Sequence, residues 1–130
     1  MSEEEKSQIP SIPKDDEDSI FDLIVKRKIP SAVVYEDDQV MAFRDITPQA
    51  PVHIVLVPKQ RDGLTRLFNA DERHKAILGH LMWAASHIAR EEHLEDGWRL
   101  VVNDGVNGSQ SVYHLHLHIL GGRKMGWPPG

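Results

Sequence analysis

Apolar residues in the first half of the chain form three short runs that predict β-strands. The runs at residues 32–35 and 40–43 are separated by four polar residues, a spacing typical of a β-hairpin. The segment 46–51 contains two prolines three positions apart, which a central strand does not accommodate, so this segment is predicted to be a loop. The run at 53–57 predicts the third strand.

Two other segments follow the period of an amphipathic helix. A short helix is predicted to begin at Asp18 or Ser19, either of which can act as a cap, and to end before Pro30. A long helix is predicted over residues 71–92, because apolar residues recur there at steps of three and four, namely Ile77, Leu81, Ala84 or Ala85, and Ile88.

The last third of the chain predicts two further strands. They cover residues 98–103 and 112–120 and are joined by a loop at 104–111 that contains glycines. The whole pattern predicts an α+β fold, with a sheet of about five antiparallel strands and one short and one long helix. Strands and helices do not alternate regularly, which argues against a dinucleotide-binding fold of the Rossmann type.

Length and charge divide the chain into a tail and a single domain. With 130 residues there is room for one domain only. Residues 1–18 hold seven acidic and two basic residues, which accounts for the whole net charge of −5. This segment has few apolar residues, so we predict a disordered acidic tail over 1–18 and a neutral domain over 19–130.

Several classes of protein are disfavoured by composition. No apolar stretch is long enough to cross a membrane, and the acidic N-terminus does not resemble a secretion signal. The chain has no cysteine, which excludes disulfides and thiolate zinc sites. A neutral domain without a basic run does not predict nucleic-acid binding. We therefore expect a cytoplasmic or nuclear protein.

The predicted last strand carries three alternating histidines, His114, His116 and His118. Because side chains of a strand alternate between its faces, the three imidazoles are predicted to form a row on one face, with apolar residues on the other.

Three interpretations of this row stay open at this point. It can be a solvated strand face, or a zinc site completed by His53, or a catalytic site in which one imidazole is the nucleophile and a second transfers a proton. The polar, glycine-containing loop before the strand could supply hydrogen-bond donors to a developing negative charge.

The spacing His114-x-His116-x-His118 resembles the signature of the histidine-triad (HIT) family. The longer stretches 19–21, 43–53, 108–118 and 127–130 resemble the Hint branch of that family, whose members are purine nucleoside phosphoramidases. Apart from the acidic tail, the similarity extends over nearly the whole chain.

The resemblance implies a homodimeric hydrolase of P–N bonds that requires neither a metal nor another cofactor. His116 would attack the α-phosphorus of a purine nucleoside 5′-phosphoramidate to form a nucleotidyl-histidine, and His118 would contact the phosphate or the leaving group. His53 and His114 would complete the imidazole cluster, and Asp45 would bind the ribose hydroxyls. The phosphate would lie against Asn103, Ser109, Gln110 and Ser111, and the base against Ile20, Phe21, Ile24, Ile29, Phe43 and Ile46.

Two positions depart from the usual Hint pattern. Ser109 stands where glycine is common, and Gly126 stands where a larger side chain is common. The C-terminal segment of Hint proteins reaches toward the partner's site, which would place Trp127 there.

Two other functions remain alternatives. One is hydrolysis of dinucleoside polyphosphates, as in another branch of the HIT family. The other is a non-enzymatic interaction protein that binds a nucleotide or zinc through the same histidines.

Overall fold

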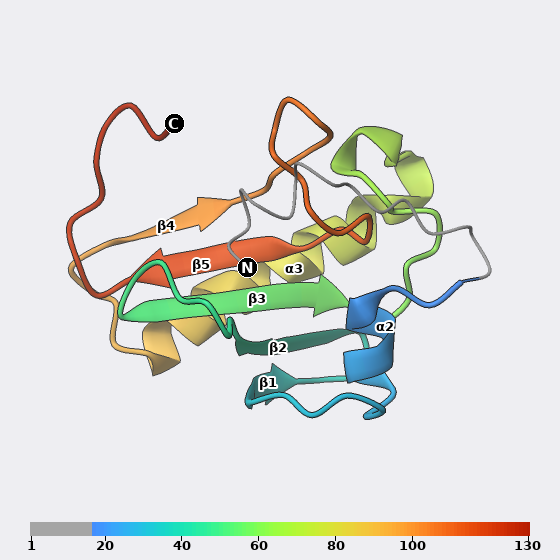
Figure 1. Cartoon of the computed structure of the whole chain (residues 1–130), viewed down its shortest axis with the longest axis horizontal. Coiled ribbons are helices and arrows are strands. Elements are labelled where there is room, and N and C mark those ends of the chain that lie inside the picture. Colours follow the sequence, from blue (N-terminus) through green and yellow to red (C-terminus); the bar gives the residue numbers. More distant parts are fainter. Residues whose placement is uncertain (1–16) are drawn as a thin grey trace.

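The computed structural model describes residues 17–130, and most of the predicted acidic tail lies outside these residues. Five strands form one antiparallel sheet in the order β1-β2-β3-β5-β4, as Figure 1 shows. The strands are β1 (Val33–Glu36), β2 (Val40–Arg44), β3 (Val52–Pro58), β4 (Trp98–Val101) and β5 (Leu117–Gly121). The predicted α+β class and five-stranded sheet are confirmed.

The two predicted helices lie on opposite faces of this sheet. The short helix α2 is Ile20–Val25, and the long helix α3 is Lys75–Glu91, preceded by the 3-10 turn Glu72–His74. Another 3-10 turn, Leu67–Asn69, lies in the connection between β3 and α3. No helix among residues 17–130 has the length and apolarity needed to cross a membrane.

Strand alternation divides the core into two layers. On β3, Ile54 and Leu56 pack with the apolar side of α3, whereas Val55 and Val57 pack with Phe21 and Ile24 of α2. The same alternation holds on β2, where Val40 and Ala42 belong to the α3 layer and Met41 and Phe43 to the α2 layer. Small residues of α3, such as Ala84 and Ala85, allow the helix to lie close to the sheet.

Helix α2 begins at the predicted cap, Ser19. The Ser19 hydroxyl accepts a hydrogen bond from the Asp22 amide at 3.1 Å, and the Asp22 carboxylate accepts one from the Ser19 amide at 2.8 Å. These reciprocal bonds form a capping box, which satisfies amides that the first helical turn leaves without partners. The helix ends at Val25, earlier than Pro30 requires, and Arg27 then adopts a left-handed φ of 59°.

The predicted strand over 112–120 is wrong in its first half. Regular pairing begins only at Leu117, and the amide of Leu115 donates instead to the carbonyl of Leu64 at 2.8 Å. The chain at 112–116 therefore follows a loop rather than the edge of β3. The apolar face was nevertheless predicted correctly, because Leu115, Leu117 and Ile119 all belong to the α3 layer.

Candidate active site

Strands β3 and β5 bring His53 and His118 together on the α2 side of the sheet. His118 pairs with Val55 in the register, so His53 is its diagonal neighbour two residues away along β3. Nε2 of His53 lies 2.9 Å from Nδ1 of His118, and both side chains are buried. Two histidines that are 65 positions apart in the sequence thus form one hydrogen-bonded pair.

The amide of Gln49 determines which ring nitrogens of this pair carry protons. This amide donates to Nδ1 of His53 at 3.0 Å, so the proton of the neutral His53 ring is on Nε2. Nε2–H of His53 then donates to Nδ1 of His118. Since Nδ1 of His118 is the acceptor, the neutral His118 ring carries its proton on Nε2.

His116 has the opposite arrangement of its ring nitrogens. Its Nδ1 lies 2.7 Å from the carbonyl oxygen of His114, which can only accept, so Nδ1 of His116 is the donor. The lone pair of His116 is therefore on Nε2. Its ring centroid lies 5.1 Å from that of His118 and 4.8 Å from that of Phe21. The site thus combines a nucleophilic imidazole nitrogen with a neighbouring N–H donor.

His114 lies on the α2 side of the sheet with His116, but its contacts differ from those of the other triad imidazoles. Its side chain is fully buried, with Nε2 3.0 Å from the carbonyl oxygen of Pro58 and Nδ1 2.7 Å from the hydroxyl of Ser19. The row was predicted from a straight strand, and residues 112–116 do not form one. Burial lowers the pKa of His114, although the Pro58 carbonyl and the Asp22 carboxylate act in the opposite direction.

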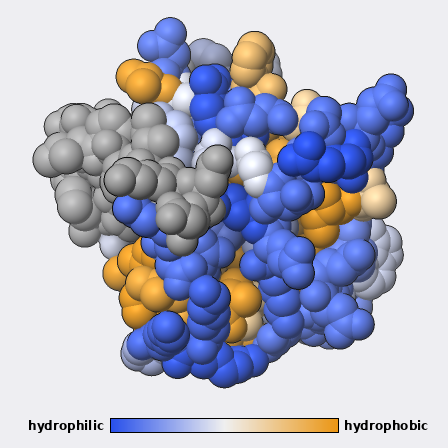
Figure 2. All heavy atoms as spheres, turned by 90° about the vertical axis from the view of Figure 1, so that its right-hand side faces the viewer, coloured by the Kyte–Doolittle hydropathy of each residue, from blue (hydrophilic) through white to orange (hydrophobic). Residues whose placement is uncertain are grey.

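A cavity of about 250 Å³ lies beside His118 on the α2 side of the sheet. Its walls are mainly apolar, and its polar side chains include Asp45 and Ser111. All six residues predicted to hold the base line this cavity, namely Ile20, Phe21, Ile24, Ile29, Phe43 and Ile46. Figure 2 looks at the end of the molecule that carries α2 and shows hydrophobic residues in separate groups on a mostly hydrophilic surface.

Asp45 has a structural contact in addition to its position at the cavity. One carboxylate oxygen accepts a hydrogen bond from the Thr47 amide at 2.7 Å, which fixes the turn after β2. The other oxygen lies 3.5 Å from Nε2 of His53. Asp45 therefore places a negative charge beside the His53–His118 pair, and its contact with ribose hydroxyls stays a prediction.

Comparison with known proteins agrees with this geometry. A family model described as HIT domain matches residues 26–125. The chain belongs to the HIT domain family. The 14 kDa zinc-binding protein of Zea mays is 57% identical over 130 residues, which cover 100% of both chains. Adenylylsulfatase HINT1 of Arabidopsis thaliana is 55% identical over 130 residues, covering 100% of this chain and 88% of that protein. This similarity confirms the predicted Hint branch.

Solved structures of HIT proteins share the fold. A HIT family hydrolase from Legionella pneumophila Philadelphia 1 superimposes with a TM-score of 0.83 at 42% identity, covering 87% of this chain and 100% of that chain. A histidine triad nucleotide-binding protein from Candida albicans gives a TM-score of 0.71 at 26% identity, covering 85% of this chain and 83% of that chain. The chain is a hydrolase-like HIT protein of the Hint branch.

The residues of the loop before the triad that were predicted to contact the phosphate lie in different environments. Ser111 lines the cavity, whereas Asn103 is half-buried at the start of the loop. Gln110 is buried, and its amide group donates to the carbonyls of Thr65 and Val112 and accepts from the amide of Gly105. Its side chain therefore holds the loop together, which differs from the direct phosphate contact that the resemblance implies.

Ser109 adopts a backbone conformation that glycine adopts more easily. This explains why glycine is common at the corresponding position of Hint proteins. The φ of Ser109 is 60°, in the left-handed region, which costs a residue with a Cβ atom about 1–2 kcal/mol. Gly108 is constrained for another reason, because a Cβ there would collide with the backbone of Asp104.

Replacing Ser109 by glycine is expected to raise the free energy of unfolding by up to about 1 kcal/mol, because the backbone strain is relieved and the greater entropy of unfolded glycine offsets part of the gain. Urea denaturation measures the change. Ser86→Gly is the matched control, since Ser86 is exposed within α3 and glycine there is expected to destabilise the protein. A Ser109→Gly variant less stable than the parent would contradict the assignment of strain.

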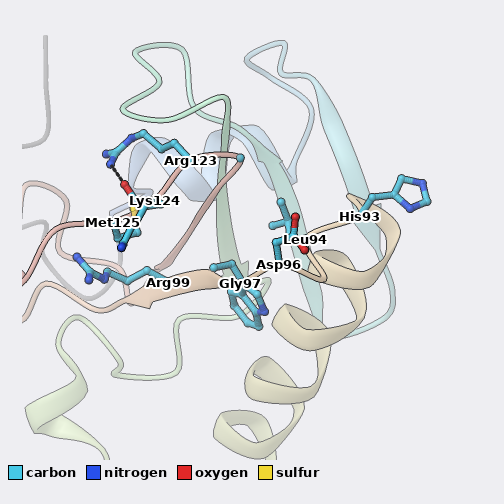
Figure 3. A pocket seen from close by; sticks show the side chains of 10 residues that line it. His93, Leu94, Asp96, Gly97, Arg99, Arg123, Lys124 and Met125 are labelled. Carbon is cyan, nitrogen blue, oxygen red and sulfur yellow. Dashed lines mark hydrogen bonds between the residues drawn. The ribbon is translucent and has the colours of Figure 1, made fainter.

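A second, wider cavity of about 620 Å³ lies at the other end of the sheet, and Figure 3 shows its lining. Its lining includes Arg99, Arg123 and Lys124 against one acidic residue, Asp96, and it contains none of the triad histidines. The Arg123 guanidinium donates to the carbonyls of Lys124 and Gln49, and that of Arg99 donates to the carbonyl of Gly126. These arginines fasten the C-terminal segment to the domain. Trp127, in that segment, is 85% exposed.

Sequence reasoning missed the groups that orient the imidazoles. They are the Ser19 hydroxyl, the Pro58 and His114 carbonyls and the Gln49 amide. Three of the four are backbone groups, which carry no residue-type signal. Ser19 was identified only as a helix cap, and nothing in its local sequence indicates a contact with a residue 95 positions away.

Proposed function

We propose that this HIT protein is a purine nucleoside phosphoramidase. One observation carries the proposal. His116 has a lone pair on Nε2, the adjacent His118 has an N–H on Nε2, and an apolar cavity lies beside them. A purine base fits the apolar walls, and its α-phosphorus would then lie near the imidazoles. The membership of the Hint branch supports the same class of substrate.

In the proposed first step, Nε2 of His116 attacks the α-phosphorus and forms a P–N bond. The bond from phosphorus to the leaving nitrogen breaks, and its electron pair goes to the amine. Nε2–H of His118 protonates this nitrogen and is itself replaced by a proton from solvent, so the His53–His118 pair stays neutral. Asp45, 3.5 Å from Nε2 of His53, favours the proton on that nitrogen and so keeps the pair in this tautomer.

In the second step, water attacks the phosphorus of the nucleotidyl-histidine. The P–N bond to His116 breaks, and its electron pair returns to Nε2 of the imidazole. The attacking water loses a proton to solvent, which balances the proton taken up in the first step. The products are a purine nucleoside monophosphate and an amine.

A second candidate substrate is adenylyl sulfate, because a relative at 55% identity is named an adenylylsulfatase. The same attack by His116 would form the same nucleotidyl-histidine, with sulfate as the leaving group. Dinucleoside polyphosphates remain the third possibility.

Initial rates with adenosine 5′-phosphoramidates, adenylyl sulfate and diadenosine polyphosphates separate these three. We expect the largest kcat/KM for the phosphoramidates. A larger value for either other substrate would overturn the proposal. A quenched single turnover with labelled phosphoramidate, followed by peptide mapping, is expected to find the nucleotide on His116.

Zinc binding is the non-enzymatic alternative, because the relatives in Zea mays and Brassica juncea are named zinc-binding proteins. Among the described residues, Asp45, His53 and His118 place one potential ligand atom each within 4.8 Å of one another. The fit is poor, since the two imidazole nitrogens are 2.9 Å apart, whereas two ligands of a tetrahedral zinc lie about 3.3 Å apart. Zinc on Nε2 of His53 would also place a proton on Nδ1, against the Gln49 amide.

We therefore propose that no metal is required. Dialysis against a chelator is expected to leave the hydrolysis rate unchanged. Metal analysis of the dialysed protein accompanies the rate measurement. Stoichiometric zinc in the purified protein, with activity lost on its removal, would contradict this proposal.

The homodimer also remains a proposal. Its support is that β4 lies at the edge of the described sheet, where a second copy could extend the strand pairing. Trp127, exposed in the C-terminal segment, would then be available to a partner's site. A cytoplasmic or nuclear location is proposed on the sequence alone.

A further inference from the structure

The N-cap of α2 contacts a buried histidine of the triad. The Ser19 hydroxyl accepts a hydrogen bond from the Asp22 amide at 3.1 Å and lies 2.7 Å from Nδ1 of His114. Both side chains are buried, so no bulk water competes for this contact. The serine therefore has a partner outside its own helix, which capping alone does not require.

The direction of the hydrogen bond follows from the other nitrogen of the ring. Nε2 of His114 lies 3.0 Å from the carbonyl oxygen of Pro58, and this oxygen can only accept. The proton of the neutral ring is therefore on Nε2, and Nδ1 carries the lone pair. Because the Ser19 oxygen already accepts from the Asp22 amide, its hydroxyl proton is the donor to Nδ1 of His114.

His114 is in turn connected to the proposed nucleophile. Its carbonyl oxygen accepts from Nδ1–H of His116 at 2.7 Å, the bond that puts the lone pair of His116 on Nε2. The ring of Phe21, two residues after Ser19, contacts both imidazoles, with centroid distances of 5.8 Å to His114 and 4.8 Å to His116. The start of α2 thus touches each member of the path from Ser19 to His116.

We propose that Ser19 is a positioning residue for His116, acting through the orientation and tautomer of His114. The inference rests on the proposed role of His116 as nucleophile. Helix α2 also lines the nucleotide cavity through Ile20, Phe21 and Ile24. The hydroxyl therefore couples the helix that forms a wall of the cavity to the reacting imidazole.

Loss of the hydroxyl changes what surrounds Nδ1 of His114. The Asp22 carboxylate is 3.5 Å away and can only accept, so it favours a proton on Nδ1. Arg61, 3.9 Å from the same carboxylate, opposes a positive charge on the ring. A neutral His114 with its proton on Nδ1 gives up its bond to Pro58, and the His114 backbone that orients His116 shifts with it.

The test separates capping from hydrogen-bond donation. Ser19→Gly removes the hydroxyl but keeps most of the capping preference, whereas Ser19→Thr keeps both. We expect kcat for the phosphoramidate to fall about tenfold in Ser19→Gly, with KM changed less than threefold, and to stay within threefold of wild type in Ser19→Thr. Asp71→Ala, which removes the cap of the turn before α3, is the matched control and is expected to keep the wild-type kcat.

Imidazole ¹⁵N chemical shifts provide a readout that does not depend on the substrate. Wild type and Ser19→Thr are expected to show His114 with its proton on Nε2 and His116 with its proton on Nδ1. In Ser19→Gly, the proton of His114 is expected to leave Nε2. Unchanged shifts and unchanged kcat in Ser19→Gly would overturn the proposal. If the wild type does not cleave phosphoramidates, the proposed function fails, and the shifts still decide whether Ser19 sets the state of His114.

Discussion

Replacement of His116 by asparagine or alanine is expected to reduce the rate of phosphoramidate hydrolysis by at least about 10³-fold, because no other group supplies the attacking electron pair. Nε2 of His116 carries the only imidazole lone pair that the hydrogen bonds of the triad leave on an Nε2 atom. Neither replacement removes a residue that lines the cavity, so binding of a nucleoside monophosphate is expected to survive. Single-turnover rates and calorimetric titration with AMP measure the two effects.

His93→Asn is the matched control for this substitution. His93 is exposed after α3 and has a left-handed φ of 59°, which asparagine tolerates. Wild-type rates are expected in this variant. Turnover near the wild-type level in either His116 variant would eliminate the nucleotidyl-histidine mechanism.

The two core layers were predictable because successive side chains of a strand point to opposite faces of the sheet, and β2 and β3 are buried on both faces. On β2 and β3, successive residues go to the α3 layer and the α2 layer in turn, and the sequence shows this as unbroken apolar runs. The long helix was predictable from a stripe that α3 buries, including Leu81 and Ile88. The capping box of α2 is likewise local, since Ser19 and Asp22 are three positions apart.

The candidate site was predictable in its members and not in its arrangement. Resemblance to the HIT family identified residues that line the cavity, but alternation alone predicted a straight strand through all three triad histidines, and regular pairing begins only at Leu117. Residues 112–116 leave the regular strand, and the amide of Leu115 pairs with the carbonyl of Leu64. That pairing joins residues 51 positions apart through backbone atoms, and the local pattern contains no sign of it.

The proton positions depend even more on long-range backbone contacts. His116 carries its proton on Nδ1, whereas His53 and His114 carry theirs on Nε2. The partners that decide this are the His114 carbonyl for His116, the Gln49 amide for His53 and the Pro58 carbonyl for His114. In the proposed mechanism, this difference between Nδ1 and Nε2 separates the nucleophile His116 from the acid His118. A sequence motif specifies which residues are present, and the loops around it specify what each one does.

Replacement of His118 by glutamine is expected to slow hydrolysis by an amount that depends on the leaving group. An amine must be protonated as its bond to phosphorus breaks, so kcat with a phosphoramidate is expected to fall about 10²–10⁴-fold. Sulfate leaves as a stable anion without a proton. Adenylyl sulfate, if it is cleaved at all, is therefore expected to lose far less activity in His118→Gln than the phosphoramidate does.

The comparison of two substrates in one variant removes the usual ambiguity of a histidine substitution. Any change in folding, nucleotide binding or the position of His116 affects both substrates alike, because they share the adenylyl group and the same nucleophile. Only loss of proton donation from Nε2 of His118 distinguishes them. His53→Gln is expected to show the same dependence more weakly, since Nε2 of His53, 2.9 Å from Nδ1 of His118, holds the donor in the required tautomer. Equal losses for both substrates in His118→Gln would show that His118 positions the phosphate and does not protonate the leaving group.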